Sequence, residues 1–228
     1  MRDLRSRVRA EEQMDDPALP PAVYDAVLSD LGQVNVWTLA ARPTLSFLAR
    51  ATEGRDRFSL LDVGFGDGGM LRTIARWARK KGKTAALVGV DLNPKSAATA
   101  QAATPPELAI DWRSGDYRDQ GRFDLVVSSL VAHHMTDDEL TAFLGWMEEN
   151  AAAGWLVNDL HRHRFAYLGF PFLARLLGVH RIVREDGQLS VARSFRRADW
   201  HTLLAAAGVR EARVFRRFPF RLCVERLR

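Results

Sequence analysis

The sequence is poor in cysteine and contains no long apolar run, and each absence excludes a class of protein. Its 228 residues include a single cysteine, Cys223, so neither an internal disulfide nor a cysteine-based metal motif can form. No window reaches the roughly 20 apolar residues that a membrane-spanning helix needs. Residues 1–16 are charged throughout and lack the apolar stretch of a secretory signal peptide. We therefore expect a soluble, cytoplasmic protein.

Acidic residues are fewer than basic ones, and the formal net charge is +5. The excess is nearly all arginine, and much of it lies after Arg162. A basic surface of this kind can attract nucleic acid or an anionic lipid surface. However, aromatic residues do not alternate with the arginines in a recognisable RNA-binding motif. We expect no nucleic-acid partner, and we leave peripheral contact with a membrane open.

Strand-like apolar runs and helical patterns alternate along most of the chain, which has no internal repeat or low-complexity segment. The expected strands are 58–63, 85–90, 108–112, 123–128, 155–159, 211–217 and 221–227. The expected helices among them are 70–80, 94–103, 137–150 and 198–207. Alternation on this scale predicts a parallel sheet with helices on both faces. The short link before the last strand predicts that the final two strands are antiparallel.

The beginning of the chain differs from this pattern. Residues 1–21 look like a charged, loosely ordered arm, and residues 22–51 have the apolar spacing of two or three helices. We therefore expect an arm and helical cap over residues 1–52, followed by the main unit over residues 53–228. Both parts are expected to form a single structural unit.

The most informative stretch is LLDVGFGDGG, residues 60–69, where an apolar strand breaks into a glycine-rich turn ahead of a helix. Glycines suit such a turn because no Cβ blocks a ligand or a positive φ. The helix N-terminus that follows offers unpaired N–H groups to a negatively charged group. Read as Gly64-x-Gly66-x-x-Gly69, the turn also fits a dinucleotide fingerprint. The turn alone therefore indicates a nucleotide-like cofactor without identifying it.

Acidic residues follow the second and third expected strands. Asp91 closes the second strand, where a carboxylate can accept hydrogen bonds from both hydroxyls of a ribose. The sequence Ser114-Gly115-Asp116-Tyr117 follows the third strand. Dinucleotide-binding folds have no matching requirement at that place, so this motif favours a different cofactor.

With the turn read as Asp62-x-Gly64-x-Gly66-x-Gly68, these motifs resemble those of class I S-adenosylmethionine-dependent methyltransferases over residues 58–228. The resemblance implies a Rossmann-like, seven-stranded, mostly parallel sheet with an antiparallel last strand, and S-adenosyl-L-methionine as the cofactor. In this family an acid at the place of Asp116 bonds the adenine amino group, and its neighbour packs on the ring. The residues expected to bind the cofactor are Asp62, Gly64, Phe65, Gly66, Gly68, Asp91, Leu92, Asp116, Tyr117, Ser129 and Arg42.

Histidines follow the fourth and fifth expected strands, at the edge of the sheet that lines the ligand crevice in such folds. His133, His134 and His161 are the candidate general bases for an acceptor that must lose a proton. Asp159, His161 and His163 would share one face if the fifth strand continued through them. Such an imidazole-rich set suits Mg²⁺ poorly, and we expect no metal ion.

The segment after the fifth strand lies where this family inserts substrate-binding elements. Residues 165–177, FAYLGFPFLARLL, are mostly apolar and are expected to form a lid over the acceptor. The lid belongs to an insertion over about residues 162–194, and Ser194 is expected to cap the helix that follows.

The overall layout is similar to that of bacterial methyltransferases acting on polyketide-derived phenols or quinone precursors. We expect O- or C-methylation of a small hydrophobic or aromatic acceptor, in secondary metabolism, by a monomer or homodimer. Three alternatives stay open: an RNA or protein methyltransferase, a nicotinamide-dependent dehydrogenase, and a catalytically silent cofactor-binding protein. Ser128-Ser129-Leu130, after the fourth strand, argues against methylation of amino groups on bases.

Overall fold

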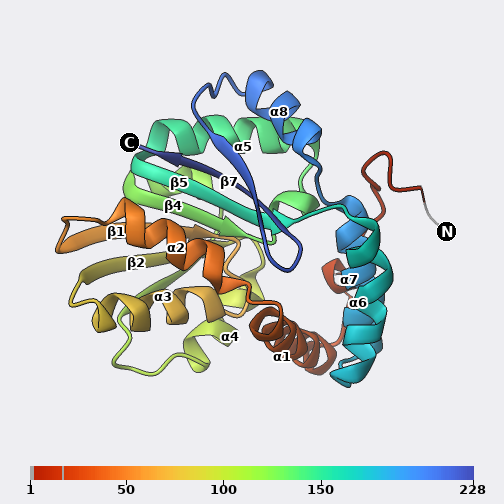
Figure 1. Cartoon of the computed structure of the whole chain (residues 1–228). Coiled ribbons are helices and arrows are strands. Elements are labelled where there is room, and N and C mark those ends of the chain that lie inside the picture. The colour runs from red at the N-terminus through yellow and green to blue at the C-terminus, as the bar shows by residue number, and fades with distance from the viewer. Residues whose placement is uncertain (1–2, 17) are drawn as a thin grey trace.

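A seven-stranded sheet forms the centre of the protein in the computed structural model, which describes residues 3–16 and 18–228 (Figure 1). The strands are β1 (Arg57–Val63), β2 (Thr84–Asp91), β3 (Ile110–Ser114), β4 (Phe123–Ser129), β5 (Ala151–Leu160), β6 (Arg213–Arg217) and β7 (Arg221–Leu227). Their order is β3-β2-β1-β4-β5-β7-β6, and only β7 runs antiparallel to its neighbours. The Rossmann-like sheet with an antiparallel last strand is therefore confirmed.

Helices cover both faces of the sheet and one of its ends (Figure 1). They are α1 (Pro21–Trp37), α2 (Ala41–Ala51), α3 (Gly69–Lys80), α4 (Pro94–Ala102), α5 (Asp137–Asn150), α6 (Arg164–Leu176), α7 (Arg181–Arg193) and α8 (Arg197–Ala206). Short 3-10 turns span Gln13–Asp15, Tyr117–Gln120 and Ala132–His134. Within the described residues, no helix has the length and apolar character needed to cross a membrane.

The alternation of side chains along the strands divides the core into two layers. Leu61 of β1 contributes to the layer that buries α5 and α8, whereas its neighbour Leu60 contributes to the layer that buries α2, α3 and α4. Consecutive strand residues point to opposite faces, so a strand buried on both faces reads as a continuous apolar run. This is why the strands were predictable from their composition.

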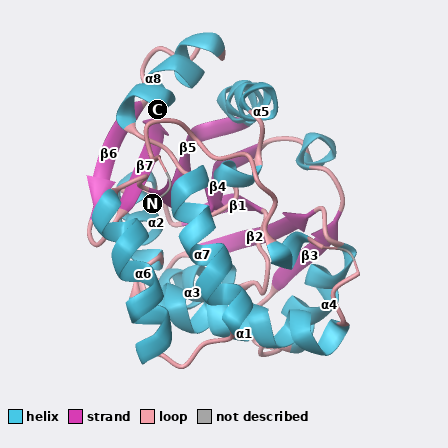
Figure 2. Ribbon diagram, turned by 90° about the vertical axis from the view of Figure 1, so that its right-hand side faces the viewer, coloured by secondary structure: helices cyan, strands magenta, loops and turns pink. Residues whose placement is uncertain are grey.

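A third apolar cluster joins α1, α6 and α7, and Figure 2 shows these helices together in front of the sheet. Its buried members include Val27 and Val34 of α1, Ala174 of α6, and Ile182 and Val183 of α7. The predicted helical cap and the predicted lid therefore form one bundle. Gly187 of α7 permits this packing, because a Cβ at that position would overlap the ring of Phe170 on α6.

Several sequence expectations are wrong in this end of the molecule. The described part of the arm, residues 3–16, is not loose: Leu4 and Glu12 are buried, and Val8 donates a backbone hydrogen bond to Ala192. The segment predicted as a lid insertion, about residues 162–194, contains two helices, of which α7 was not predicted because its sequence is largely polar. Ser194 does not cap α8, since its hydroxyl donates back to the carbonyl of Ser190 in α7.

Candidate active site

The glycine turn after β1 requires glycine at three positions with positive φ, for two different reasons. A Cβ at Gly64 (φ +75°) would overlap Val131, and one at Gly68 (φ +77°) would overlap the ring of Trp112. These two glycines therefore allow close packing. A Cβ at Gly66 (φ +57°) would meet no protein atom within 4 Å. Gly66 therefore leaves free space beside the turn, as the approach of a ligand to the backbone requires.

Replacing Gly64 by alanine is expected to lower the free energy of unfolding by about 3 kcal/mol, since it adds overpacking against Val131 to backbone strain. Gly66→Ala is the matched control, because it adds the strain of a positive φ without a clash, and should cost about 1 kcal/mol. Urea denaturation measures both values. Equal losses for the two variants would contradict the packing role given to Gly64.

Asp62, near the end of β1, carries a buried carboxyl group. Its side chain is 1% exposed, and its Oδ2 has no hydrogen-bond partner among the described residues. Burial, and next the charges of Asp91 and Asp67, raise the pKa of Asp62 to about 7. A cationic group bound nearby would relieve this repulsion and stabilise the ionised form.

Asp91 ends β2 beside the turn. Its Oδ2 accepts a hydrogen bond from the backbone N–H of Gly66 at 2.9 Å, and its Oδ1 accepts one from Asn93 at 2.8 Å. Burial raises the pKa of Asp91 against the opposing effect of these two bonds. The next residue, Leu92, is one of the expected cofactor contacts and is 75% exposed, so its apolar side chain lies open next to Asp91.

The motif after β3 has one residue in an unexpected place. Asp116 caps the short turn Tyr117–Gln120 by accepting a hydrogen bond from the backbone of Arg118, and it remains partly exposed. Tyr117, by contrast, is buried, with its ring centroid 4.8 Å from that of Phe143 and 5.1 Å from that of Trp146. Its ring belongs to the core, and we withdraw Tyr117 from the predicted cofactor contacts.

Two adjoining cavities open next to the glycine turn. The first, here called the turn cavity, has a volume of about 550 Å³ and is lined by Asp62, Gly64 and three arginines, Arg42, Arg72 and Arg76. The second, here called the apolar cavity, has a volume of about 420 Å³ and lies beneath α1, α6 and α7. Both are lined by Gly64, Phe65, Asp67, Ser129 and Leu130, so one wall is common to the two.

Two residues with a strained backbone conformation lie at these cavities. Among the described residues, positive φ outside glycine occurs at Leu39 (+55°) and Leu130 (+63°). Both residues line the turn cavity, and Leu130 also lines the apolar cavity. Residues held in the left-handed region cost free energy and cluster at functional sites. The strain therefore points to the same place as the sequence motifs.

His133 lies at the apolar cavity, held by a buried carboxylate. Its Nδ1 is 2.8 Å from Oδ1 of Asp159, and its backbone N–H donates to Oδ2 at 3.1 Å. Burial opposes ionisation of Asp159, but the charge and hydrogen bonds of His133 lower the Asp159 pKa below its ordinary value. In the neutral form of His133, a carboxylate at Nδ1 favours the tautomer with its proton on Nδ1, which leaves a lone pair on Nε2.

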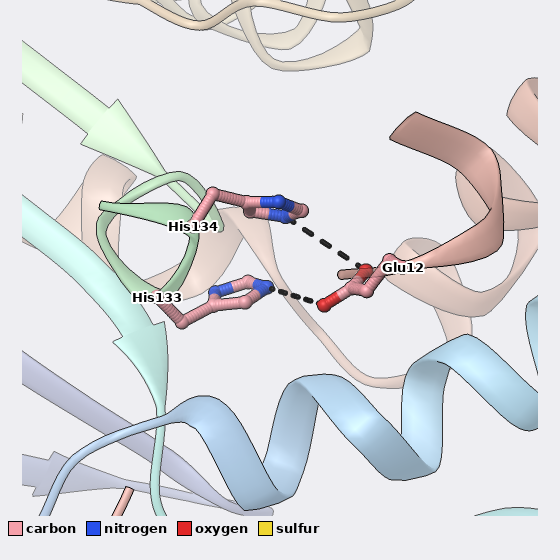
Figure 3. A group of neighbouring side chains, drawn as sticks. All are labelled: Glu12, His133 and His134. Carbon is pink, nitrogen blue, oxygen red and sulfur yellow. Dashed lines mark ion pairs between the residues drawn. The ribbon is translucent and has the colours of Figure 1, made fainter. Parts of the chain in front are cut away.

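Figure 3 shows Glu12 of the N-terminal arm facing both histidines. Its two carboxylate oxygens are 3.7 Å from Nε2 of His133 and 3.8 Å from Nε2 of His134. Nδ1 of His134 is 3.0 Å from Oδ2 of Asp15. Burial would lower the pKa of His134, but the hydrogen bond to Asp15 and the charge of Glu12 raise it. The sequence alone did not identify Glu12 as a site residue, because no local pattern distinguishes it from its charged neighbours.

The side chains of Glu12, His133 and His134 have their potential ligand atoms within 4.8 Å of one another, which is a spacing that a metal ion could use. The carboxylate of Glu12 has other partners, however: the hydroxyl of Ser190 donates to it at 2.9 Å, and Nε of Arg193 lies 3.8 Å away. A guanidinium beside the carboxylate opposes a second cation. We therefore interpret the cluster as a set of polar contacts that holds the N-terminal arm against the two histidines.

His161 lies apart from this cluster and lines neither cavity. Burial, and next the charge of Arg216, lower the pKa of His161 to about 4. The predicted face of Asp159, His161 and His163 does not form, because β5 ends at Leu160 and Asp159 binds His133 instead. His161 is therefore withdrawn as a candidate base.

Arg221, which the sequence analysis did not single out, brings a buried positive charge to the wall of the apolar cavity. It is 2% exposed, and its Nη2 is 3.2 Å from the hydroxyl of Thr38 and 3.5 Å from Oδ1 of Asn35. Its Nη1 has no hydrogen-bond partner among the described residues. Burial lowers the pKa of Arg221, although Asp159 opposes this effect. A buried guanidinium without an ion pair is costly, so an anionic ligand would be stabilised here.

Comparison with known proteins places the sequence motifs in a family context. Residues 60–154 match a family profile described as a methyltransferase domain. No curated protein sequence gives a significant match. The matched segment runs from β1 into β5 and contains the glycine turn, Asp91 and the two cluster histidines.

Solved structures of methyltransferases share the fold. Magnesium protoporphyrin IX methyltransferase from Synechocystis PCC 6803 with bound SAH is 17% identical, covers 95% of this chain and 91% of its own, and has a TM-score of 0.57. Human N-acetylserotonin methyltransferase in complex with SAM is 18% identical, with 96% and 63% covered and a TM-score of 0.59. A plantazolicin methyltransferase in complex with a pentazolic desmethylPZN analog and SAH is 12% identical, with 90% and 96% covered and a TM-score of 0.62.

Proposed function

We propose that this chain, which matches a methyltransferase domain profile over residues 60–154, is a class I S-adenosylmethionine-dependent methyltransferase that methylates a small hydrophobic or aromatic acceptor held in the apolar cavity. The proposal rests on one observation: the turn cavity and the apolar cavity differ in chemical character and share a wall. One is rich in charged groups beside a glycine turn, and the other is mostly apolar with His133 in its lining. A volume of about 420 Å³ suits a small molecule.

The residues around the turn fit S-adenosylmethionine. Asp91 offers carboxylate oxygens for the ribose hydroxyls, and Asp62 offers a buried negative charge for a cationic group. Arg42 lies in the same cavity, where its guanidinium suits a carboxylate. When bound, S-adenosylmethionine supplies a methyl group that its sulfonium already activates.

The apolar cavity supplies position and proton removal. Its walls hold the acceptor in line with the methyl donor and exclude water. Both effects lower the barrier to methyl transfer. A phenol or enol hydroxyl directed at Nε2 of His133 would transfer its proton there, while Asp159 holds the imidazole in orientation. This arrangement favours oxygen as the methylated atom.

Incubation with methyl-labelled S-adenosylmethionine and a panel of hydroxylated aromatic and quinone-like acceptors tests the function. We expect a labelled methyl ether from at least one panel member, detected by mass spectrometry. Labelling of RNA or protein instead would overturn the acceptor class. Binding of S-adenosylhomocysteine without turnover on any acceptor would favour the catalytically silent alternative.

The buried guanidinium of Arg221 predicts that the apolar cavity prefers acceptors that carry a negative charge. Because its guanidinium is buried beside the cavity and forms no ion pair with any residue that the structure describes, Arg221→Met should raise KM at least about tenfold for an acceptor bearing a carboxylate. KM for the corresponding methyl ester should change little, and thermal stability should not fall, since a buried unpaired charge is removed. Arg216→Met on the exposed surface of β6 is the matched control. Equal effects on acid and ester would contradict a role in anion recognition.

A further inference from the structure

The exposed large apolar side chains of this protein lie mostly in three segments. Val36 and Trp37 end α1, Phe218 lies in the β6–β7 turn, and the largest group lies on α6. Among the described residues, only Leu92 at the cofactor site adds to this set. An exposed apolar side chain is ordinary alone, but a concentration on neighbouring segments marks an interaction surface.

Helix α6 is apolar on two faces. Phe165, Leu168, Phe172 and Leu176 are spaced by three, four and four residues, which places them along one side of the helix. All four are exposed, and Phe172 and Leu176 are 72% and 84% exposed. The inner side carries Ala174, which is buried, and Leu173, which lines the apolar cavity. Core packing therefore explains the inner side only.

The same three segments carry no negative charge. No Asp or Glu occurs in residues 31–52, 160–184 or 212–224, although each stretch contains arginines. Arg164 and Arg175, at the two ends of α6, are exposed and have no ion pair among the described residues. A face that combines apolar side chains with unpaired arginines is complementary to an anionic lipid surface.

A cleft beside α6 strengthens this match. Its volume is about 640 Å³, and its lining includes Arg5, Arg164 and Arg196, with Asp3 as the single acid. Leu168, which belongs to the exposed stripe formed by Phe165, Leu168, Phe172 and Leu176 of α6, also lines this cleft. Three arginines next to apolar side chains suit a phosphate headgroup beside its acyl chains.

The exposed stripe leads to the apolar cavity. Phe165 is exposed and also lines that cavity. In the β6–β7 turn, Phe218 is exposed while Phe220 lines the cavity, and the ring of His163 lies 5.4 Å from each of the rings of Phe165 and Phe220. The exposed apolar residues of α6 and of this turn therefore adjoin residues that line the apolar cavity.

We propose that this face, formed by α6, the end of α1 and the β6–β7 turn, docks on an anionic lipid bilayer and receives a lipophilic acceptor from it. The acceptor part rests on the proposed function, whereas the docking part does not. A second copy of the chain is a poorer occupant, because symmetric contact would bring arginines against arginines. The helix lies on the bilayer surface and does not span it.

Vesicle co-sedimentation tests the docking. The wild type should bind vesicles of phosphatidylcholine with 30% phosphatidylglycerol, should not bind phosphatidylcholine alone, and should be released by high salt. Phe172→Ser combined with Leu176→Ser should weaken binding at least about tenfold, because two exposed apolar anchors are lost. Leu92→Ser, an exposed apolar position elsewhere, is the matched control and should bind as the wild type does.

Methylation of a water-soluble acceptor separates the two proposals. The double variant should retain this activity and its thermal stability, since Phe172 and Leu176 line neither cavity. Undiminished vesicle binding by the double variant, or no binding by the wild type, would overturn the docking and leave the proposed function intact. A wild-type dimer that the double substitution dissociates, without vesicle binding, would identify the face as a protein interface and also overturn it. Vesicle binding without methylation of any acceptor would sustain the docking and count against the proposed function.

Discussion

Replacing Asp91 by alanine is expected to weaken binding of S-adenosylhomocysteine at least about 100-fold. The carboxylate at the end of β2 presents two acceptor oxygens, and each hydrogen bond from a ribose hydroxyl to a charged acceptor contributes about 1.5–3 kcal/mol. Loss of two such bonds multiplies the dissociation constant by 100 or more. Isothermal titration calorimetry measures this directly.

Two further titrations make this result specific. Asp111→Ala removes an exposed carboxylate from the neighbouring strand β3 and should leave binding unchanged. Thermal unfolding of Asp91→Ala checks that loss of the bonds to Gly66 and Asn93 has not disordered the turn. A folded Asp91→Ala protein that binds as tightly as the wild type would remove Asp91 from the cofactor site.

Replacing His133 by alanine is expected to lower kcat about 1000-fold for an acceptor whose hydroxyl must lose a proton, with little change in KM. General bases typically contribute between about 100-fold and 10,000-fold, and His133 has the buried carboxylate that a base requires for orientation. Single-turnover kinetics with bound cofactor isolates this step from product release.

The neighbouring histidine is the control for His133. His134→Ala should slow the reaction only a few-fold, because Nδ1 of His134 contacts Asp15 and its pKa is raised. Added imidazole should restore part of the activity of His133→Gly, which a purely structural role would not allow. Equal losses in the alanine variants of both histidines, without rescue, would contradict the assignment of His133 as the base.

The features that the sequence predicted well are those encoded locally. An apolar run followed by glycines specifies the strand and turn at residues 58–69, because few other residues adopt the positive φ found at Gly64 and Gly68. Asp91 was identified by its place at the end of a strand. Boundaries were less certain: β5 begins at Ala151, earlier than predicted, because alanines carry little strand signal.

The features that the sequence missed depend on contacts between distant segments. Glu12 reaches the histidines because the arm packs along α7, and no local pattern reports that path. Asp159 meets His133 because β4 and β5 pair with Ser129 opposite Asn158, which brings the two strand ends together. Arg221 faces the cavity through the antiparallel register of β7 against β5.

A crystal structure of the protein with S-adenosylhomocysteine is the most direct measurement of the central claim, that donor and acceptor occupy adjoining cavities. We predict the ribose at Asp91, the amino acid end in the turn cavity with Arg42, and the sulfur facing the apolar cavity at Leu130. The nucleoside bound elsewhere, or its sulfur facing away from that cavity, would contradict the account.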